Sequence, residues 1–235
     1  MSGSPNLQQF TAEQIAQEQR RGVLVLDTRP AEQFASFHIP RSMQLGLLGP
    51  FASWAAILIE PTQELLLVAE SATAAEEARS RLARVGLKHV LGFVVADRKH
   101  WQNHGLTPVS LPIHRCKDVS RHLREGRPLQ LVDVRSSAEW LQGHLPGATS
   151  VPLLELHSEA ASIDFSRPSL VYCHEGYRAS TAASLLLRDY ASDVGILIDG
   201  IEGWQACGLP LEAPSSPRSE YSGTTLSPVS HTAHE

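Results

Sequence analysis

The chain has 235 residues, of which 42% are hydrophobic and 19% are charged. This balance is typical of a globular protein with enough apolar side chains for a core, and the length suits one or two domains. The formal net charge of −5 argues against nucleic acid or an anionic membrane as the main partner, because both are bound chiefly through Lys and Arg.

The absence of targeting signals and the spacing of the cysteines indicate the cellular compartment. No apolar run approaches the roughly 20 residues that a membrane span needs, and residues 1–6 lack the basic and apolar pattern of a secretory signal. Cys116, Cys173 and Cys207 lie far apart, which fits neither a disulfide framework nor a zinc cluster. We therefore expect a cytoplasmic protein with free thiols.

The first half of the chain alternates helical and apolar segments. A helix capped by Thr11 is expected over residues 11–20. Three short apolar runs that are typical of strands follow, at 23–26, 65–68 and 90–95. A second helix is expected over 74–84, between the last two of these runs. Strands that are apolar on both faces and alternate with helices indicate a parallel sheet covered on both sides. The pattern predicts an α/β doubly wound fold, whose ligand sites lie beyond the carboxyl ends of the strands.

The second half repeats the first. The matched residues Asp27, Arg29, His38 and Pro40 recur 106 positions later as Asp133, Arg135, His144 and Pro146. Helices are expected over 116–124, capped by Ser110 or Asp118, and over 178–188, with strands at 129–134, 170–172 and 195–198. Such self-similarity is the signature of duplicated units.

We therefore predict two copies of one domain, over 1–107 and 108–212. Trp101 and Trp204, near the ends of the two copies, are expected in their cores. The tail, 213–235, is rich in Ser, Thr and Pro, and we expect it to be disordered because it cannot bury enough apolar surface.

The segment 170–180, LVYCHEGYRAS, carries the strongest chemical signal. Cys173 ends a predicted strand, and a short loop with Gly176 leads to a helix beginning near Arg178. Backbone N–H groups of such a loop and helix N-terminus can hold an anion, and this setting favours the nucleophilic thiolate form of a cysteine. Gly176 permits a tight turn, and Arg178 offers a forked cationic donor for an anionic substrate.

Three blocks in order resemble the rhodanese family: VDVR…EW…GHLPGA, CHEGYRAS and IDGIEGWQACGLPL. The resemblance extends to about residue 211, with one departure where Ile201 separates Gly200 from Gly203. It implies two tandem rhodanese-like domains, each a parallel sheet flanked by helices.

The resemblance also implies a sulfurtransferase that works through a Cys173 persulfide. The implied donor is thiosulfate, mercaptopyruvate or a persulfide, and the acceptor is a thiol, cyanide or a protein cysteine. No metal or organic cofactor is implied. In the first copy a gapless match sets Ala69 opposite Cys173, Ala72 opposite Gly176 and Ala74 opposite Arg178, so we expect that copy to be catalytically inactive.

The remaining candidates fall into two groups. His174, Glu175, Gly176, Tyr177 and Arg178 are expected to contact the substrate, although the charge of Glu175 would repel a dianion. A second group is expected to be structural, because its members recur in both copies or lack the chemical context of Cys173: Asp133 and Arg135 near the site, their counterparts Asp27 and Arg29, His38, His144, Cys116 and Cys207.

Two other functions remain open. One is a non-enzymatic persulfide carrier or sensor that uses the same Cys173. The other is a phosphatase or arsenate reductase of the same fold. The second is disfavoured because Cys173 to Arg178 spans six positions, one fewer than the loop that holds a tetrahedral oxyanion in those enzymes, and because Glu175 would repel phosphate.

Overall fold

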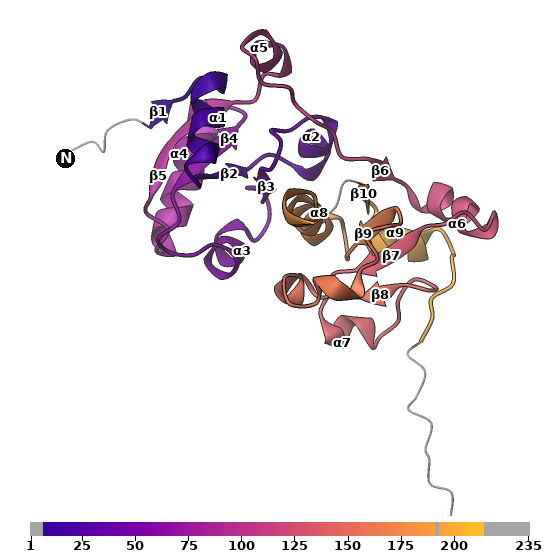
Figure 1. Ribbon diagram of the computed structural model, residues 1–235. Helices are drawn as coiled ribbons and strands as arrows, with labels where there is room; N and C mark the ends of the chain where they lie inside the picture. Colours follow the sequence, from indigo (N-terminus) through magenta and orange to yellow (C-terminus); the bar gives the residue numbers. More distant parts are fainter. Residues whose placement is uncertain (1–6, 191–192, 214–235) are drawn as a thin grey trace, which may run out of the picture.

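The computed structural model describes residues 7–190 and 193–213. The expected tail, 213–235, lies outside the described residues except for residue 213, as does the N-terminal segment 1–6. Two units follow one another along the chain (Figure 1). Each contains one parallel sheet with helices packed against it, as the repeat predicts.

The first unit contains strands β1 (Gln8–Gln9), β2 (Leu24–Asp27), β3 (Met43–Gln44), β4 (Leu65–Ala69) and β5 (Val90–Val95). Its helices are α1 (Ala12–Arg20), α2 (Ala31–Ser36), α3 (Phe51–Leu58), α4 (Ala72–Arg84) and α5 (Arg98–Asn103).

The second unit contains strands β6 (Ile113–His114), β7 (Gln130–Asp133), β8 (Thr149–Ser150), β9 (Ser169–Tyr172) and β10 (Val194–Leu197). Its helices are α6 (Cys116–Arg124), α7 (Ser137–Trp140), α8 (Tyr177–Asp189) and α9 (Gly200–Ala206), with 3₁₀ turns η1 (Leu153–Glu155) and η2 (Ala160–Ser162).

The two sheets have the same topology. Their strand orders are β1-β5-β4-β2-β3 and β6-β10-β9-β7-β8, so each strand of the first sheet has its counterpart in the second. Neighbouring strands run parallel throughout both sheets. The α/β fold class and the tandem duplication are thereby confirmed, and the carboxyl ends of β7 and β9 lie side by side at one sheet edge.

Helix α1 begins with a local side-chain cap, whereas the start of α6 depends on a long-range contact. The Thr11 side chain accepts from the Gln14 N–H, and the Gln14 side chain accepts from the Thr11 N–H, which forms a capping box. The sequence predicted Ser110 or Asp118 as the cap of α6, and this prediction is wrong. Arg115 is the N-cap and gives no side-chain cap; instead the Asp199 carboxylate accepts from the Cys116 N–H at 3.3 Å.

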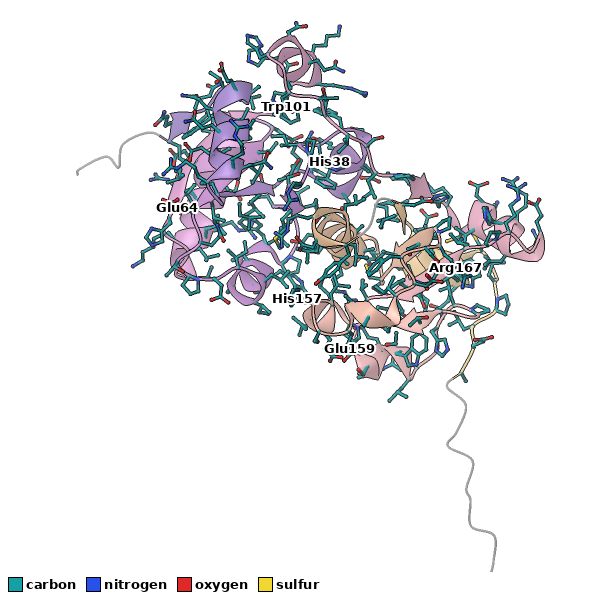
Figure 2. The ribbon with its side chains drawn as sticks, viewed as in Figure 1. His38, Glu64, Trp101, His157, Glu159 and Arg167 are labelled. Carbon is teal, nitrogen blue, oxygen red and sulfur yellow. The ribbon has the colours of Figure 1, made fainter. Side chains whose placement is uncertain are left out.

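A buried tryptophan lies in the core of each unit. Trp101 (Figure 2) and Trp204 are buried and donate their indole N–H to the carbonyls of Val95 and Pro210. These bonds satisfy the polar edge of each buried ring. The expectation that both tryptophans are core residues is therefore confirmed.

The repeated Asp and Arg side chains form buried ion pairs. Arg29 contacts Asp27, and Arg135 contacts Asp133, with an Nη2–Oδ2 distance of 2.6 Å in both units. Each arginine also donates to a backbone carbonyl eight residues along the chain. In such a pair each buried charge compensates the other, so the recurrence of the pair reflects architecture, as expected.

The repeated histidines are also structural. His38 (Figure 2) stacks on Phe34, and His144 stacks on Trp140. Their backbones form isolated bridges to Val109 and Glu212, which tie the end of each unit to its own histidine. Burial lowers the pKa of His38 from its ordinary value, so this ring stays neutral at pH 7.

The two units meet at helix α8, which lies between them (Figure 1). The Gln44 N–H on β3 donates to Ser184 Oγ at 2.9 Å, and the Tyr177 hydroxyl donates to the Gly46 carbonyl at 2.8 Å. The small side chains of α8 are buried accordingly, among them Ala179, Ala182 and Ala183. The helix that begins at the candidate site is thus held from both sides.

Within the described part of the chain, the longest helices have 13 residues, and none combines the length and the apolar composition of a membrane span.

Candidate active site

Cys173 follows directly after β9, at the carboxyl edge of the second sheet. Its residue is 1% exposed. Its carbonyl accepts from the Ile201 N–H at 2.9 Å, and the His174 carbonyl accepts from the Glu202 N–H at 3.3 Å. The first turn of α9 therefore packs directly on the peptide groups that follow β9.

Two glycines allow this close packing. Gly176 has φ +87°, and a Cβ atom there would lie 2.6 Å from the Ile198 carbonyl oxygen. Gly200 has φ +58°, and a Cβ atom there would lie 2.0 Å from the His174 carbonyl oxygen. Both positions need left-handed backbone and a missing side chain, which only glycine supplies without strain.

The loop that follows Cys173 has backbone N–H groups without a protein acceptor among the described residues. The Ala179 N–H donates to Cys173 Sγ at 3.4 Å. Within residues 7–190 and 193–213, the N–H groups of residues 174–178 have no acceptor on the protein. Gly176, the N-cap of α8, provides no side-chain cap. Five consecutive donors at a helix N-terminus can therefore stabilise negative charge on a sulfur held there.

In the first unit a serine hydroxyl caps the helix that corresponds to α8. Ser71 is the N-cap of α4, and its Oγ accepts from the Ala74 N–H at 3.2 Å. In the second unit Cys173 Sγ accepts from Ala179, the equivalent third helical residue. The Cys173 sulfur thus takes the hydrogen-bonding role that the Ser71 hydroxyl has in the first unit.

The structure corrects part of the gapless match between the copies. Val68 and Tyr172 pair with equivalent aspartates, so Ala69 does lie opposite Cys173. However, α4 begins at Ala72 and α8 at Tyr177, which makes the loop of the first unit one residue shorter. Ser71, not Ala72, therefore matches Gly176, and Thr73, not Ala74, matches Arg178.

Arg178 is held by a carboxylate. Its Nη1 and Nη2 donate to the two oxygens of Glu139, each at 2.7 Å. Glu139 also caps α7 together with Ser136. The Arg178 hydrogen bonds lower the pKa of Glu139 from its ordinary 4.5 to about 2, and the same contact raises the pKa of Arg178.

Glu139 was missing from the residues that the sequence predicted for the site. The signal was present, because Ser136-x-x-Glu139 has the spacing of a capping box. That spacing predicts a helix start, but it does not reveal that the same carboxylate reaches an arginine 39 positions away.

We expect Glu139→Gln to lose this ion pair while keeping the capping box, since glutamine also serves there. Because the folded-state pKa of Glu139 is depressed, the pair stabilises the protein above pH 4.5 and its contribution is lost as the pH falls toward 2. Urea unfolding should show wild type more stable by about 1 kcal/mol at pH 6, since both side chains are partly exposed, and the two proteins should converge near pH 2. A constant difference across this range would contradict the assignment.

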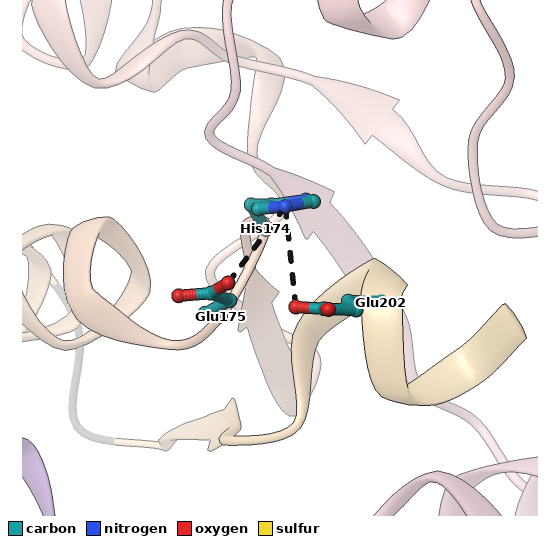
Figure 3. Close-up of side chains that lie close together, drawn as sticks. All are labelled: His174, Glu175 and Glu202. Carbon is teal, nitrogen blue, oxygen red and sulfur yellow. Dashed lines mark ion pairs between the residues drawn. The ribbon is translucent and has the colours of Figure 1, made fainter. Parts of the chain in front are cut away.

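The side chains of His174, Glu175 and Glu202 lie close together at the exposed mouth of the site (Figure 3). His174 Nε2 lies 3.9 Å from Glu175 Oε1 and 4.0 Å from Glu202 Oε2. All three side chains are more than half exposed. The sequence placed His174 and Glu175 at the mouth but missed Glu202, because α9 returns to the loop only in the folded chain.

Tyr177 lies away from this mouth. Its ring packs against Gly49, where a Cβ would come within 2.1 Å of the ring, and its hydroxyl bonds Gly46. The structure therefore places Tyr177 against the first unit rather than beside His174 and Glu175.

Two cavities flank the Arg178–Glu139 pair. One, of about 240 Å³, is lined by Arg135, Glu139, Gln142, Gly143, His174, Ile201, Gln205 and Leu211. The other, of about 330 Å³, is lined by Trp54, Val134, Ser136, Ser137, Ala138, Pro152, Leu153, Leu154, Glu155 and Arg178. The ion pair thus contributes one partner to each cavity and stands between them.

The other two cysteines have different surroundings. Cys116 is buried, and burial together with the charge of Asp199 raises the pKa of its thiol to about 12. Cys207 is exposed at the end of α9. Neither thiol accepts a backbone N–H bond at an uncapped helix start within the described residues.

The family model of the rhodanese-like domain matches residues 116–207. A sulfurtransferase of Allochromatium vinosum is 32% identical over 98 residues, which cover 42% of this chain and 92% of that protein. An HTH-type transcriptional regulator of Mycobacterium tuberculosis is 34% identical over 90 residues, but this chain spans only 40% of its length.

Among solved structures, the rhodanese-like domain from an Anabaena protein aligns with 53% of this chain and 98% of its own, at 26% identity and a TM-score of 0.41. The family match lies on the second unit, the one that carries Cys173. On the family match and the near-complete coverage of the Allochromatium protein, the chain belongs to the rhodanese family.

Proposed function

We propose that the protein transfers sulfane sulfur through a persulfide on Cys173. The observation that carries the proposal is the Cys173 sulfur at an uncapped helix start, bonded to the Ala179 N–H and next to five N–H groups that have no acceptor among the described residues. The rhodanese-like match over this unit and the sulfurtransferase name of a relative support the same chemistry.

In the first half-reaction the Cys173 thiolate attacks the outer sulfur of a donor. A bond forms between Sγ and that sulfur while the bond from the outer sulfur to the rest of the donor breaks. The electron pair leaves with the remainder, as sulfite from thiosulfate or as a thiolate from a persulfide. With 3-mercaptopyruvate the single sulfur is attacked, its C–S bond breaks, and the electron pair leaves as the enolate of pyruvate. The loop N–H groups stabilise the charge on the new terminal sulfur.

In the second half-reaction a nucleophilic acceptor attacks the terminal sulfur. Thiolate or cyanide takes that sulfur, and the electron pair of the S–S bond returns to Cys173. Two half-reactions through one covalent intermediate give ping-pong kinetics. The chemistry needs only the thiol and the two substrates, with no metal or organic cofactor.

The cellular compartment that we propose follows from the need for a reduced thiol. A nucleophilic cysteine must stay reduced to work, which suits the cytoplasm, and Cys116, Cys173 and Cys207 are free thiols. The partners are a small sulfur donor and a thiol, cyanide or protein-cysteine acceptor, without nucleic acid or membrane. The first unit, with Ala69 opposite Cys173, supports α8 without taking part in the chemistry.

The test is a panel of donors followed by intact-mass measurement. Thiosulfate, 3-mercaptopyruvate and glutathione persulfide are each incubated with the full chain, and then cyanide or a thiol is added. We expect a gain of one sulfur atom that is discharged rapidly and repeatedly.

Other outcomes would overturn the proposal. A stable adduct that leaves only to a protein cysteine would indicate a carrier. Hydrolysis of p-nitrophenyl phosphate, lost on Cys173→Ser, with no gain of sulfur from any donor would indicate a phosphatase.

A further inference from the structure

The charges around Cys173 bear on which donor the site accepts. Thiosulfate carries two negative charges, and only its outer sulfur is transferred. The loop amides can serve that one sulfur atom, so the sulfite portion must rest outside the loop, against the side chains at the mouth. A site for such a donor therefore needs a cation that is not already neutralised there.

The arginines beside the loop are each matched by a carboxylate. Both terminal nitrogens of Arg178 bind Glu139 at 2.7 Å. Arg135, which lines the cavity of about 240 Å³ next to His174, is paired with buried Asp133 at 2.6 Å. Each guanidinium has N–H donors beyond those that bind its carboxylate, but its positive charge is already neutralised by that carboxylate, so it offers a dianion little net attraction.

The rim adds negative charge. Glu175 lies in the loop itself, two residues after Cys173, and the Glu202 backbone bonds the His174 carbonyl. Both carboxylates reach His174 Nε2, at 3.9 and 4.0 Å (Figure 3). One imidazole faces two carboxylates, so the mouth carries net negative charge in either protonation state of His174.

We infer, resting on the proposed sulfur transfer, that the donor is a persulfide whose carrier portion is cationic or uncharged, and that Glu175 and Glu202 select against dianionic donors. For such a donor, R–S–SH, the Cys173 thiolate attacks the terminal sulfur, and the S–S bond of the donor breaks. The R–S⁻ leaving group takes the proton of the transferred sulfur, so the products are R–SH and Cys173–S–S⁻, and atoms, electrons and protons balance without a further oxidant or reductant.

The test compares two donors of opposite charge, thiosulfate and cysteamine persulfide, with the full chain and the Glu175→Gln/Glu202→Gln double variant. Initial rates are measured with cyanide as acceptor at low ionic strength. Removing two charges near a dianion should raise kcat/KM for thiosulfate by about tenfold, and it should lower kcat/KM for the cationic persulfide by about threefold. Added salt should raise the thiosulfate rate of wild type and not that of the double variant.

Glu64→Gln is the matched control. Glu64 lies at the exposed surface of the first unit (Figure 2). Its substitution by glutamine removes a carboxylate charge away from the mouth. Its kinetics should equal those of wild type with both donors. Equal kcat/KM for the two donors in wild type, or shifts of the same sign in the double variant, would overturn the charge selection. Failure of every donor to load sulfur onto wild type would instead overturn the proposed function.

Discussion

Cys173→Ser should abolish sulfur transfer. The serine hydroxyl is nearly isosteric with the thiol and can accept the Ala179 N–H bond, as Ser71 does for α4 in the first unit. The fold should therefore persist, while the weakly nucleophilic hydroxyl forms no persulfide. We expect kcat/KM to fall by at least about a thousandfold with every donor that wild type accepts.

The remaining cysteines provide the controls for that result. Cys207→Ser changes an exposed thiol and should retain full activity. Cys116→Ala should also stay active, because the buried Cys116 thiol packs in the core and its hydrogen bond is to the Gly200 carbonyl, at 3.8 Å. Circular dichroism and urea unfolding of the three variants separate loss of chemistry from loss of fold. Substantial turnover by a folded Cys173→Ser protein would rule out Cys173 as the sulfur carrier.

Gly200→Ala should damage both stability and turnover. The new Cβ would lie 2.0 Å from the His174 carbonyl oxygen and 2.7 Å from the Cys173 carbonyl oxygen, so the start of α9 or the loop must move. Together with the left-handed φ of +58°, we expect a loss of about 2–4 kcal/mol in the free energy of unfolding. Because the displaced backbone carries the sulfur, kcat should fall at least about tenfold.

Gly208→Ala is the matched control for Gly200→Ala. Gly208 follows α9, has a left-handed φ of +67°, and has open space where a Cβ would be placed. Its substitution carries the conformational cost alone, about 1 kcal/mol, and should leave kcat unchanged. Urea unfolding and initial rates measure both effects. If the two variants behave alike, the close contact between Gly200 and the loop has no role in holding the site.

Local patterns predicted much of this fold and the centre of the site. The sequence predicted the strand, loop and helix around Cys173 because an apolar run, a glycine and a helical segment follow one another there. The Asp133–Arg135 pair was readable because its partners are two residues apart and recur as Asp27–Arg29. The strands of two residues, such as β3 and β8, are too short to give a periodic signal.

What the sequence could not predict depends on distant segments meeting. The Glu139 contact spans 39 positions and the Tyr177 contact with Gly46 spans 131. Glu202 reaches the mouth only because Gly200 lets α9 pack on the loop. These contacts give two predicted residues partners that the sequence did not reveal: Arg178 binds the Glu139 carboxylate, and Tyr177 packs on the first unit.

A crystal structure of the chain after sulfur loading tests the central claim most directly. The account predicts one extra sulfur atom bonded to Cys173 Sγ, within hydrogen-bonding distance of at least two of the N–H groups of residues 174–178. An extra sulfur on Cys116 or Cys207 would contradict it, as would one on Cys173 directed into apolar packing with those N–H groups bonded elsewhere.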